Sequence, residues 1–155
     1  MKKEVLVTIS GLHTEQAVKH GGVNENILEV VTPGTYYLKN GKHYVLYDEA
    51  VEGSTELIKN KIKLQEDSLE IMKSGLTNAH MIFERNKKNL SYYDTGFGHL
   101  IVAVNTKSMD VQVGEERIDV SVDYELDINH QPLADCRIRL NIASREQVDL
   151  LGKTH

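Results

Sequence analysis

A short segment near the middle of the chain has glycines at a spacing that could serve phosphate binding. It runs from Tyr92 to His99 and reads YYDTGFGH, with Gly96 and Gly98 on either side of one phenylalanine. A dinucleotide-binding loop needs a third glycine three residues later, followed by a helix, but Ile101 occupies that position. The apolar, β-branched run 100–104 that follows is typical of a strand. We therefore interpret the glycines as a place where a strand bends.

Acidic residues at alternate positions of one predicted strand could indicate a metal site or paired catalytic carboxylates. They are Asp119, Asp123, Glu125 and Asp127. Same-face residues on one strand lie roughly 6.6 to 7 Å apart per step of two, too far to share a small cation without a partner strand. The following strand carries arginines instead. The expected cross-strand pairs are Asp127–Arg137, Glu125–Arg139 and Asp119–Arg145, which favours a solvated, charge-matched outer face.

Histidine and cysteine offer little further chemistry. The seven histidines are scattered, and none forms a His-x-x-x-His pair or a similar metal-ligand spacing. Cys136 is the only cysteine, so the chain cannot form an internal disulfide or a multi-cysteine metal cage. It falls on the apolar side of its predicted strand, where we expect it to pack as a small hydrophobe. We therefore expect no metal and no cofactor.

Six of the seven tyrosines lie in two clusters, and the larger one surrounds a predicted hairpin. Two runs, 35–39 and 42–47, flank Asn40-Gly41, the favoured pair for a two-residue turn with both central residues at positive φ. Pairing across this turn opposes Lys39 to Lys42, and this lysine pair should face water. The opposite face then points into the fold. Its residues are Tyr36, Leu38, His43, Val45 and Tyr47.

The elements that position these residues are strands, because apolar residues alternate with a period of two along most of the chain. Further strands are predicted over residues 4–12, 27–32, 56–64, 69–73, 79–85, 90–94, 99–106, 118–128 and 136–142. Turns are predicted at Pro33-Gly34 and over residues 129–132. Only residues 67–73 and the segment after Ser144, where Ser144 and Gln147 form a capping box, suggest helix. Short strands at regular spacing indicate an antiparallel barrel or sandwich.

Size and composition bound the function. A chain of 155 residues fits one domain, and we expect a barrel over about 4–143 with a short tail, 144–155. The net charge of -5 argues against non-specific binding to nucleic acid. Lys2 and Lys3 are followed at once by Glu4, and no apolar run approaches the roughly 20 residues of a membrane span. We expect a cytoplasmic protein without a membrane anchor.

Several segments carry a resemblance to a known family. In chain order they are residues 34–49, 81–84, 93–98 with Thr106, and 124–128. Together they resemble the YwiB-like family of bacterial proteins, a domain of unknown function, over about 4–142. The resemblance implies a calycin-like, that is lipocalin-like, antiparallel β-barrel of about eight to ten strands with little helix, in a small cytoplasmic protein. It carries over no catalytic or ligand-binding residue.

Three functions follow from such a barrel. The first is the binding of a small apolar or amphipathic ligand in the lumen, since barrels of about eight strands hold side chains or one modest ligand. The predicted lining residues are Tyr36, Leu38, His43, Val45, Tyr47, Met81, Phe83 and Tyr93. The second is protein interaction or self-association through a barrel face or an open edge strand, which includes a homo-oligomer. The third, which we favour least, is an enzyme with His43, His80 or His99 as general base beside Glu84 or Asp94.

Overall fold

The computed structural model describes residues 2–12, 27–50, 53–75, 78–95 and 98–145. Ten strands in these ranges close a barrel in the order β1-β10-β9-β8-β7-β6-β5-β4-β3-β2, and all neighbours are antiparallel. The predicted all-β antiparallel barrel is confirmed. The strands are β1 (Lys2–Leu12), β2 (Ile27–Lys39), β3 (Lys42–Ala50), β4 (Leu57–Leu64), β5 (Ser68–Ser74), β6 (Asn78–Glu84), β7 (Lys88–Thr95), β8 (Gly98–Val113), β9 (Arg117–Ile128) and β10 (Gln131–Ser144).

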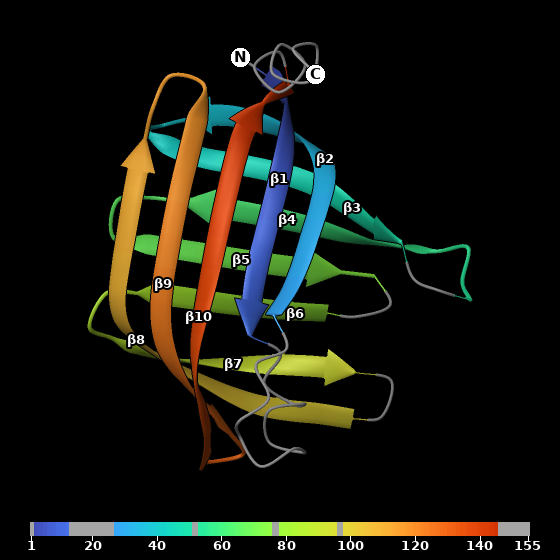
Figure 1. The fold of residues 1–155 in the computed structure, drawn as a ribbon. Helices are drawn as coiled ribbons and strands as arrows, with labels where there is room; N and C mark the ends of the chain where they lie inside the picture. Colours follow the sequence, from blue (N-terminus) through green and yellow to red (C-terminus); the bar gives the residue numbers. More distant parts are fainter. Residues whose placement is uncertain (1, 13–26, 51–52, 76–77, 96–97, 146–155) are drawn as a thin grey trace.

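The strands form two groups that cross at a steep angle (Figure 1). β3 to β7 run across the view, whereas β1, β9 and β10 run from top to bottom. β2 and β8 belong to both groups because each bends along its length and changes partner. A strand that turns from one sheet direction to the other at a corner is the usual way to close such a barrel.

The corner in β2 lies at Pro33-Gly34, where the sequence predicts a turn. That prediction is wrong, since both residues lie inside a continuous strand and pair with β1. A Cβ atom built on Gly34 would lie 2.9 Å from the carbonyl oxygen of Leu46 and 3.2 Å from Cγ2 of Val7. Glycine therefore allows β1, β2 and β3 to approach closely at this corner.

The corner in β8 coincides with a β-bulge. The pairing with β9 shifts by one residue between Thr106 and Ser108, and the strand continues to Val113. The sequence predicts a strand that stops at Thr106, so it misses the second half of β8. A bulge adds one unpaired residue and increases the local bend, which explains how one strand of 16 residues serves both groups.

Two hairpins test the turn predictions. Asn40 and Gly41 have φ of 52° and 75°, and Lys39 lies opposite Lys42, as predicted. Between β7 and β8 the chain also reverses, because Thr95 lies opposite Gly98, and a strand rather than a helix follows. Residues 96–97 themselves lie outside the described residues. The absence of a following helix excludes the predicted alternative of a phosphate-binding loop. The predicted bend within a strand is also wrong, because the chain reverses here between two separate antiparallel strands.

The register between β9 and β10 differs from the predicted one by four residues, because Cys136 lies opposite Tyr124 and not Ile128. The three predicted ion pairs are therefore wrong: Asp127–Arg137, Glu125–Arg139 and Asp119–Arg145. The hairpin turn is only two residues long, with Asn129 and His130 both at positive φ, and a bulge follows between Pro132 and Ala134. Turn geometry fixes the register, and exposed charge pairs of about 0.2–1 kcal/mol each do not override it.

One apolar cluster fills the barrel. Its fully buried side chains come from β1, β3, β4, β5, β6, β8 and β9: Val7, Val45, Ile62, Leu64, Leu69, Phe83, Val104 and Val122. Cys136 is buried in the same cluster, as its place on the apolar side of the strand predicts. Residues 67–73, where a helix is conceivable from sequence, form most of strand β5. The capping box falls at Ser144 and beyond, where residues 146–155 lie outside the described residues. Among the described residues, no helix is long and apolar enough to cross a membrane.

Candidate functional site at one end of the barrel

The centre of the lumen is occupied by side chains. Of the predicted lining residues, Val45 and Phe83 are at most 1% exposed and Tyr47 is also buried. Met81 is half-buried and packs against the same cluster. The Phe83 ring meets the ring of Tyr124 edge-on, with 4.9 Å between centroids. These residues stabilise the fold, so a ligand site has to be sought at an end of the barrel.

Three other predicted residues lie together at the β2–β3 hairpin. The hydroxyl of Tyr36 is 2.7 Å from Nδ1 of His43, and the two rings stack with centroids 5.8 Å apart. Leu38 lies opposite His43 as predicted, but it is 52% exposed, so its expected place inside the lumen is wrong. The reason is that the hairpin tip extends beyond Tyr37, the last residue of β2 that pairs with β1.

Tyr93, the remaining predicted lining residue, lies in β7 opposite Ala79 of β6 and Leu100 of β8. Its side chain lies outside the described part of the structure.

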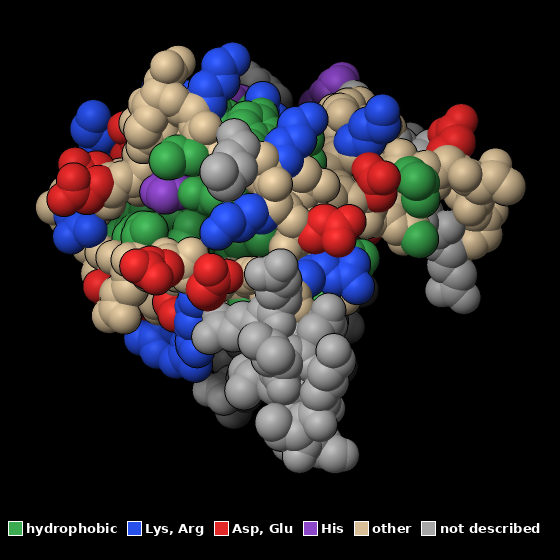
Figure 2. Space-filling model, turned by 90° about the horizontal axis from the view of Figure 1, so that it is seen from above, with side chains coloured by type: hydrophobic (Ala, Val, Ile, Leu, Met, Phe, Trp, Pro, Cys, Tyr) green, Lys and Arg blue, Asp and Glu red, His purple; other side chains and the backbone are tan. Residues whose placement is uncertain are grey.

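A cavity of about 450 Å³ opens beside His43, between β8 and the tips of three hairpins. We call it the end cleft. Its lining residues are Gly41, His43, Gln65, Glu66, Arg85, Met109, Asp110, Val111 and Val113. Seen from above, the molecule shows a group of hydrophobic side chains around a histidine, with acidic and basic side chains at the border (Figure 2). The surface that lines the end cleft is mostly polar, and its smaller apolar part comes from residues of β8.

The aromatic pair at the wall of the end cleft is uncharged at neutral pH. Burial lowers the pKa of His43 below its ordinary value of 6.5 and raises the pKa of Tyr36 above 10.0. A neutral imidazole and a protonated phenol can each donate and accept a hydrogen bond. The pair can therefore offer polar groups to a ligand without adding charge to the cleft.

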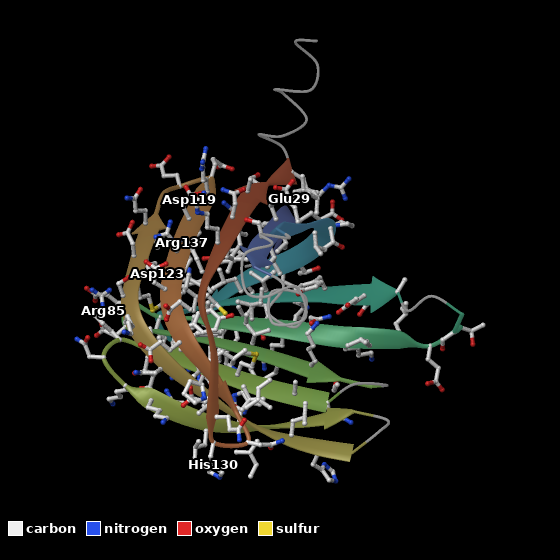
Figure 3. The ribbon with its side chains drawn as sticks, turned by 60° about the horizontal axis from the view of Figure 1, so that its bottom comes forward. Glu29, Arg85, Asp119, Asp123, His130 and Arg137 are labelled. Carbon is white, nitrogen blue, oxygen red and sulfur yellow. The ribbon has the colours of Figure 1, made fainter. Side chains whose placement is uncertain are left out.

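The rim of the end cleft carries more negative than positive charge. Glu66 and Asp110 are acidic, whereas Arg85 is the one permanently charged cation among the lining residues that the structure describes. Figure 3 shows Arg85 at the edge of the barrel, beside the turn between β6 and β7. Lys107 lies two residues before Met109 in β8, but its ammonium group pairs with Glu125. A cationic ligand group is therefore favoured over an anionic one.

A second polar cluster lies among residues of β3, β4 and β5 and was not found from the sequence. Lys73 Nζ donates to Glu49 Oε1 at 2.8 Å, and Asn60 Nδ2 donates to the same oxygen at 3.3 Å. Burial alone raises the pKa of Glu49, but Lys73 and Asn60 outweigh it and hold the pKa below the ordinary value. Burial, together with the charge of Glu49, raises the pKa of Tyr47 to about 12. The one sequence signal is an asparagine at position 60 in an otherwise apolar alternation.

The outer face over β8, β9 and β10 carries the acidic residues discussed above (Figure 3). Arg137 donates to both carboxylate oxygens of Asp123, at 2.5 and 3.2 Å. Asp119 pairs with Arg117 of its own strand at 2.7 Å and accepts from Asn141. The charges are matched, as predicted for a solvated face, although with different partners. A shallow groove of about 570 Å³ crosses this face between Thr8, Asp110, Arg117 and Arg139.

The pairs expected for an enzyme are not formed where the structure describes both partners. His80 contacts Glu70 at 2.9 Å rather than Glu84, and His43 contacts Tyr36. His99 lies opposite Asp94 in the β7–β8 ladder, but the side chain of Asp94 lies outside the described residues. Among the residues described, no three or more His, Cys, Asp or Glu side chains are grouped closely enough to hold a metal ion.

Comparison with known proteins confirms the resemblance. The model of a domain of unknown function, DUF1934, matches residues 12–140. The chain is 28% identical over 131 residues to the "Uncharacterized beta-barrel protein YwiB" of Bacillus subtilis (strain 168), covering 84% of this chain and 88% of that protein. It also superimposes on the crystal structure of the ywiB protein from Bacillus subtilis with a TM-score of 0.75, at 20% identity and over 92% of each chain. This structural likeness shows the shared barrel fold.

Proposed function

The chain belongs to the DUF1934 family of β-barrel proteins, and from the shape of its barrel end we propose that it is a binding protein whose ligand occupies the end cleft. The ligand is amphipathic, with an apolar part against β8 and a polar, preferably cationic, group at the rim. The observation that carries the proposal is the cavity of about 450 Å³ beside His43. Small-molecule sites commonly occupy about 300–1,000 Å³ and often lie in the mouths of β-barrels.

The lining of the end cleft matches such a ligand. Met109 is buried and Val111 packs against the core cluster, so both hold this part of β8 in place. Val113 is 55% exposed beside them and offers apolar surface that a ligand can cover. Glu66 and Asp110 supply negative charge at the rim. Binding at the end of a packed barrel extends the calycin-like, lipocalin-like fold that the family resemblance implies, in a protein that we place in the cytoplasm.

Protein interaction or self-association is the second candidate function. The exposed apolar side chains favour it, since Leu38, Leu46 and Val113 are each more than a third exposed. Single exposed apolar residues are common on soluble proteins, however, whereas a cavity of about 450 Å³ has the size of a small-molecule site. Ligand binding in the end cleft is therefore the stronger proposal.

Two amphiphiles with heads of opposite charge test the proposal. Decyltrimethylammonium and decanoate, both below their micelle concentrations, are added to the full-length protein while thermal unfolding and amide chemical shifts are followed. We expect the cationic probe to raise the Tm and to shift the amides of His43, Met109 and Val111. A ligand at 100 times its Kd stabilises by about 2.7 kcal/mol.

A matched pair of variants controls for non-specific adsorption. Val113→Asn places an amide in the end cleft, whereas Leu90→Asn makes the same change at an exposed position of β7. We expect only Val113→Asn to weaken binding of the cationic probe. Equal effects of both variants, or amide shifts scattered over the surface, would show that the end cleft is not the binding site.

A further inference from the structure

One side of the second half of β8 has no neighbouring strand among the residues that the structure describes. Up to Thr106 the strand is bonded on both sides, because Thr106 N–H donates to Lys87 and its C=O accepts from Asn86. The ladder with β9 continues from Ser108 to Val113, but the ladder with β7 does not. The open edge of this half lies along the end cleft, which Met109, Asp110, Val111 and Val113 line.

The direction of the backbone groups follows from the turn after β8. Gly114 N–H donates to the carbonyl of Arg117 at 2.7 Å, so the backbone groups of Gly114 point toward β9. In an antiparallel ladder successive residues direct their N–H and C=O to opposite sides. Met109, Val111 and Val113 therefore direct theirs to the open edge. Three donors and three acceptors lie along one wall of the end cleft.

The opposite wall limits what can pair with this edge. It consists of turn residues, with Gly41 and His43 from the β2–β3 hairpin, Gln65 and Glu66 from the β4–β5 turn, and Arg85 from the β6–β7 turn. A space of about 450 Å³ between the two walls holds a few residues of a single extended segment. It does not accommodate the edge of a second barrel together with the strands behind it.

The chemistry of the two faces specifies the side chains of that segment. Residues that point inward lie on the same side as the side chains of Met109, Val111 and Val113, so they should be apolar. Residues that point outward lie beside the carboxylate of Asp110 and near Glu66, for which the described residues provide no ion pair. Alternate basic residues complement this rim, and the chain as a whole has a net charge of -5.

We infer that the ligand of the end cleft is an extended peptide that adds to β8 as a further strand beside 109–113, with apolar and basic residues in alternation. The inference rests on the proposed function and names its ligand class. Pairing of this kind takes affinity from main-chain hydrogen bonds and specificity from alternate side chains. It also gives the exposed Val113 an apolar partner. The backbone N–H and C=O groups at the open edge of β8 then have hydrogen-bond partners.

Hydrogen exchange in the full-length protein tests the inference with a named probe, the acetylated and amidated peptide Lys-Val-Lys-Val-Lys-Val-Lys. We expect the amides of Met109, Val111 and Val113 to exchange at least tenfold more slowly with saturating peptide. The amides of Asp110 and Gln112, which point toward β9, should change little. The same composition in the order Lys-Lys-Lys-Lys-Val-Val-Val should bind at least tenfold more weakly.

A matched pair of variants isolates the backbone contribution. Val111→Pro removes the N–H at the open edge but no hydrogen bond to β9, and proline is accepted on edge strands. Val111→Ala shortens the side chain and keeps the N–H. We expect the proline variant to lose at least tenfold more affinity than the alanine variant. If the proline variant does not fold, the probe peptide with N-methylated valines, tested on the unmodified protein, supplies the same comparison and should not bind.

The outcomes distinguish failure of the peptide inference from failure of the proposed function. If decyltrimethylammonium binds in the end cleft and the peptide does not, the peptide inference falls and the proposed function stands. If neither binds, both fall. Protection of 109–113 that rises with protein concentration and without peptide, together with a dimer in light scattering, would identify a second copy as the occupant and overturn the inference.

Discussion

Replacing Gly34 with alanine should destabilise the barrel because three strands meet closely at that corner. The new Cβ would lie 2.9 Å from the carbonyl oxygen of Leu46, about half an ångström closer than an ordinary contact. Leu46 lies in β3, which pairs with β4, and Val7, at 3.2 Å, is fully buried, so neither neighbour can move freely. Overpacking of this kind costs about 1–3 kcal/mol. For a chain of this length that corresponds to a Tm lower by about 2–12 °C.

Gly11→Ala is the matched control, since Gly11 also lies inside a strand and its nearest neighbour stands at 3.4 Å from the new Cβ. Alanine restricts the unfolded chain more than glycine, so we expect no loss and a gain of up to about 1 kcal/mol. Both variants are unfolded in urea at 25 °C and followed by circular dichroism, because the chain has no tryptophan. Equal midpoints for the two variants would refute the close-packing argument.

Three further predictions address single side chains. Thr106→Val should stabilise the protein by about 1 kcal/mol in urea unfolding, because the buried hydroxyl has no partner among the described residues; a loss would mean that it has one. Since burial lowers the pKa of His43, the unfolded state binds a proton more readily just below pH 6.5. Stability should therefore be full above that pH and fall as the pH drops toward the folded pKa, and His43→Gln should flatten this slope relative to the unchanged protein. Arg137→Ala should leave the urea midpoint nearly unchanged despite its short contacts with Asp123, because both side chains are exposed, and NMR titration should show the lowered pKa of Asp123 rising toward its ordinary value.

The sequence predicts hairpins well where the turn chemistry is explicit. Asn40-Gly41 combines the two residue types that most readily adopt positive φ, and the register of β2 and β3 follows from it. The turn between β9 and β10 has the same geometry but places His130 at φ 68°, a conformation in which histidine is uncommon. Because Pro132 cannot donate a ladder hydrogen bond, the sequence predicts a turn over 129–132 instead of the two-residue turn. The predicted register is therefore wrong by four residues.

The bends and the candidate site depend on contacts that alternation within one strand does not encode. The second half of β8 also alternates, with Met109, Val111 and Val113 on one side and Asp110 and Gln112 on the other. What alternation does not encode is the bulge between Thr106 and Ser108, which carries the strand on past Thr106. His43 and Tyr36 were recognised as candidate residues because they share a face of one hairpin. Arg85 and Glu66 were not, because they lie in turns that meet β8 only after the barrel closes.

Arg137 and Asp123 show the same limit for charge patterns. The sequence correctly predicts that acidic and basic residues alternate on the outer face, but several registers match the charges about equally well. The turn at Asn129-His130 fixes the register, and a cation from a third strand then joins the face. Lys107 of β8 pairs with Glu125, and its pKa is raised chiefly by that contact and further by Asp135. A prediction that pairs only β9 with β10 does not take Lys107 into account.

The seam between β1 and β10 has a consequence for how the protein is made. Val5 lies opposite Ser144 and Gly11 opposite Ile138, so β1 can pair with β10 and close the barrel only after β10 has been synthesised. Contacts so distant along the chain form slowly. Until then the partly synthesised sheet has open strand edges, which can pair with other chains. Its charged outer face, or chaperones, would have to limit aggregation during this time.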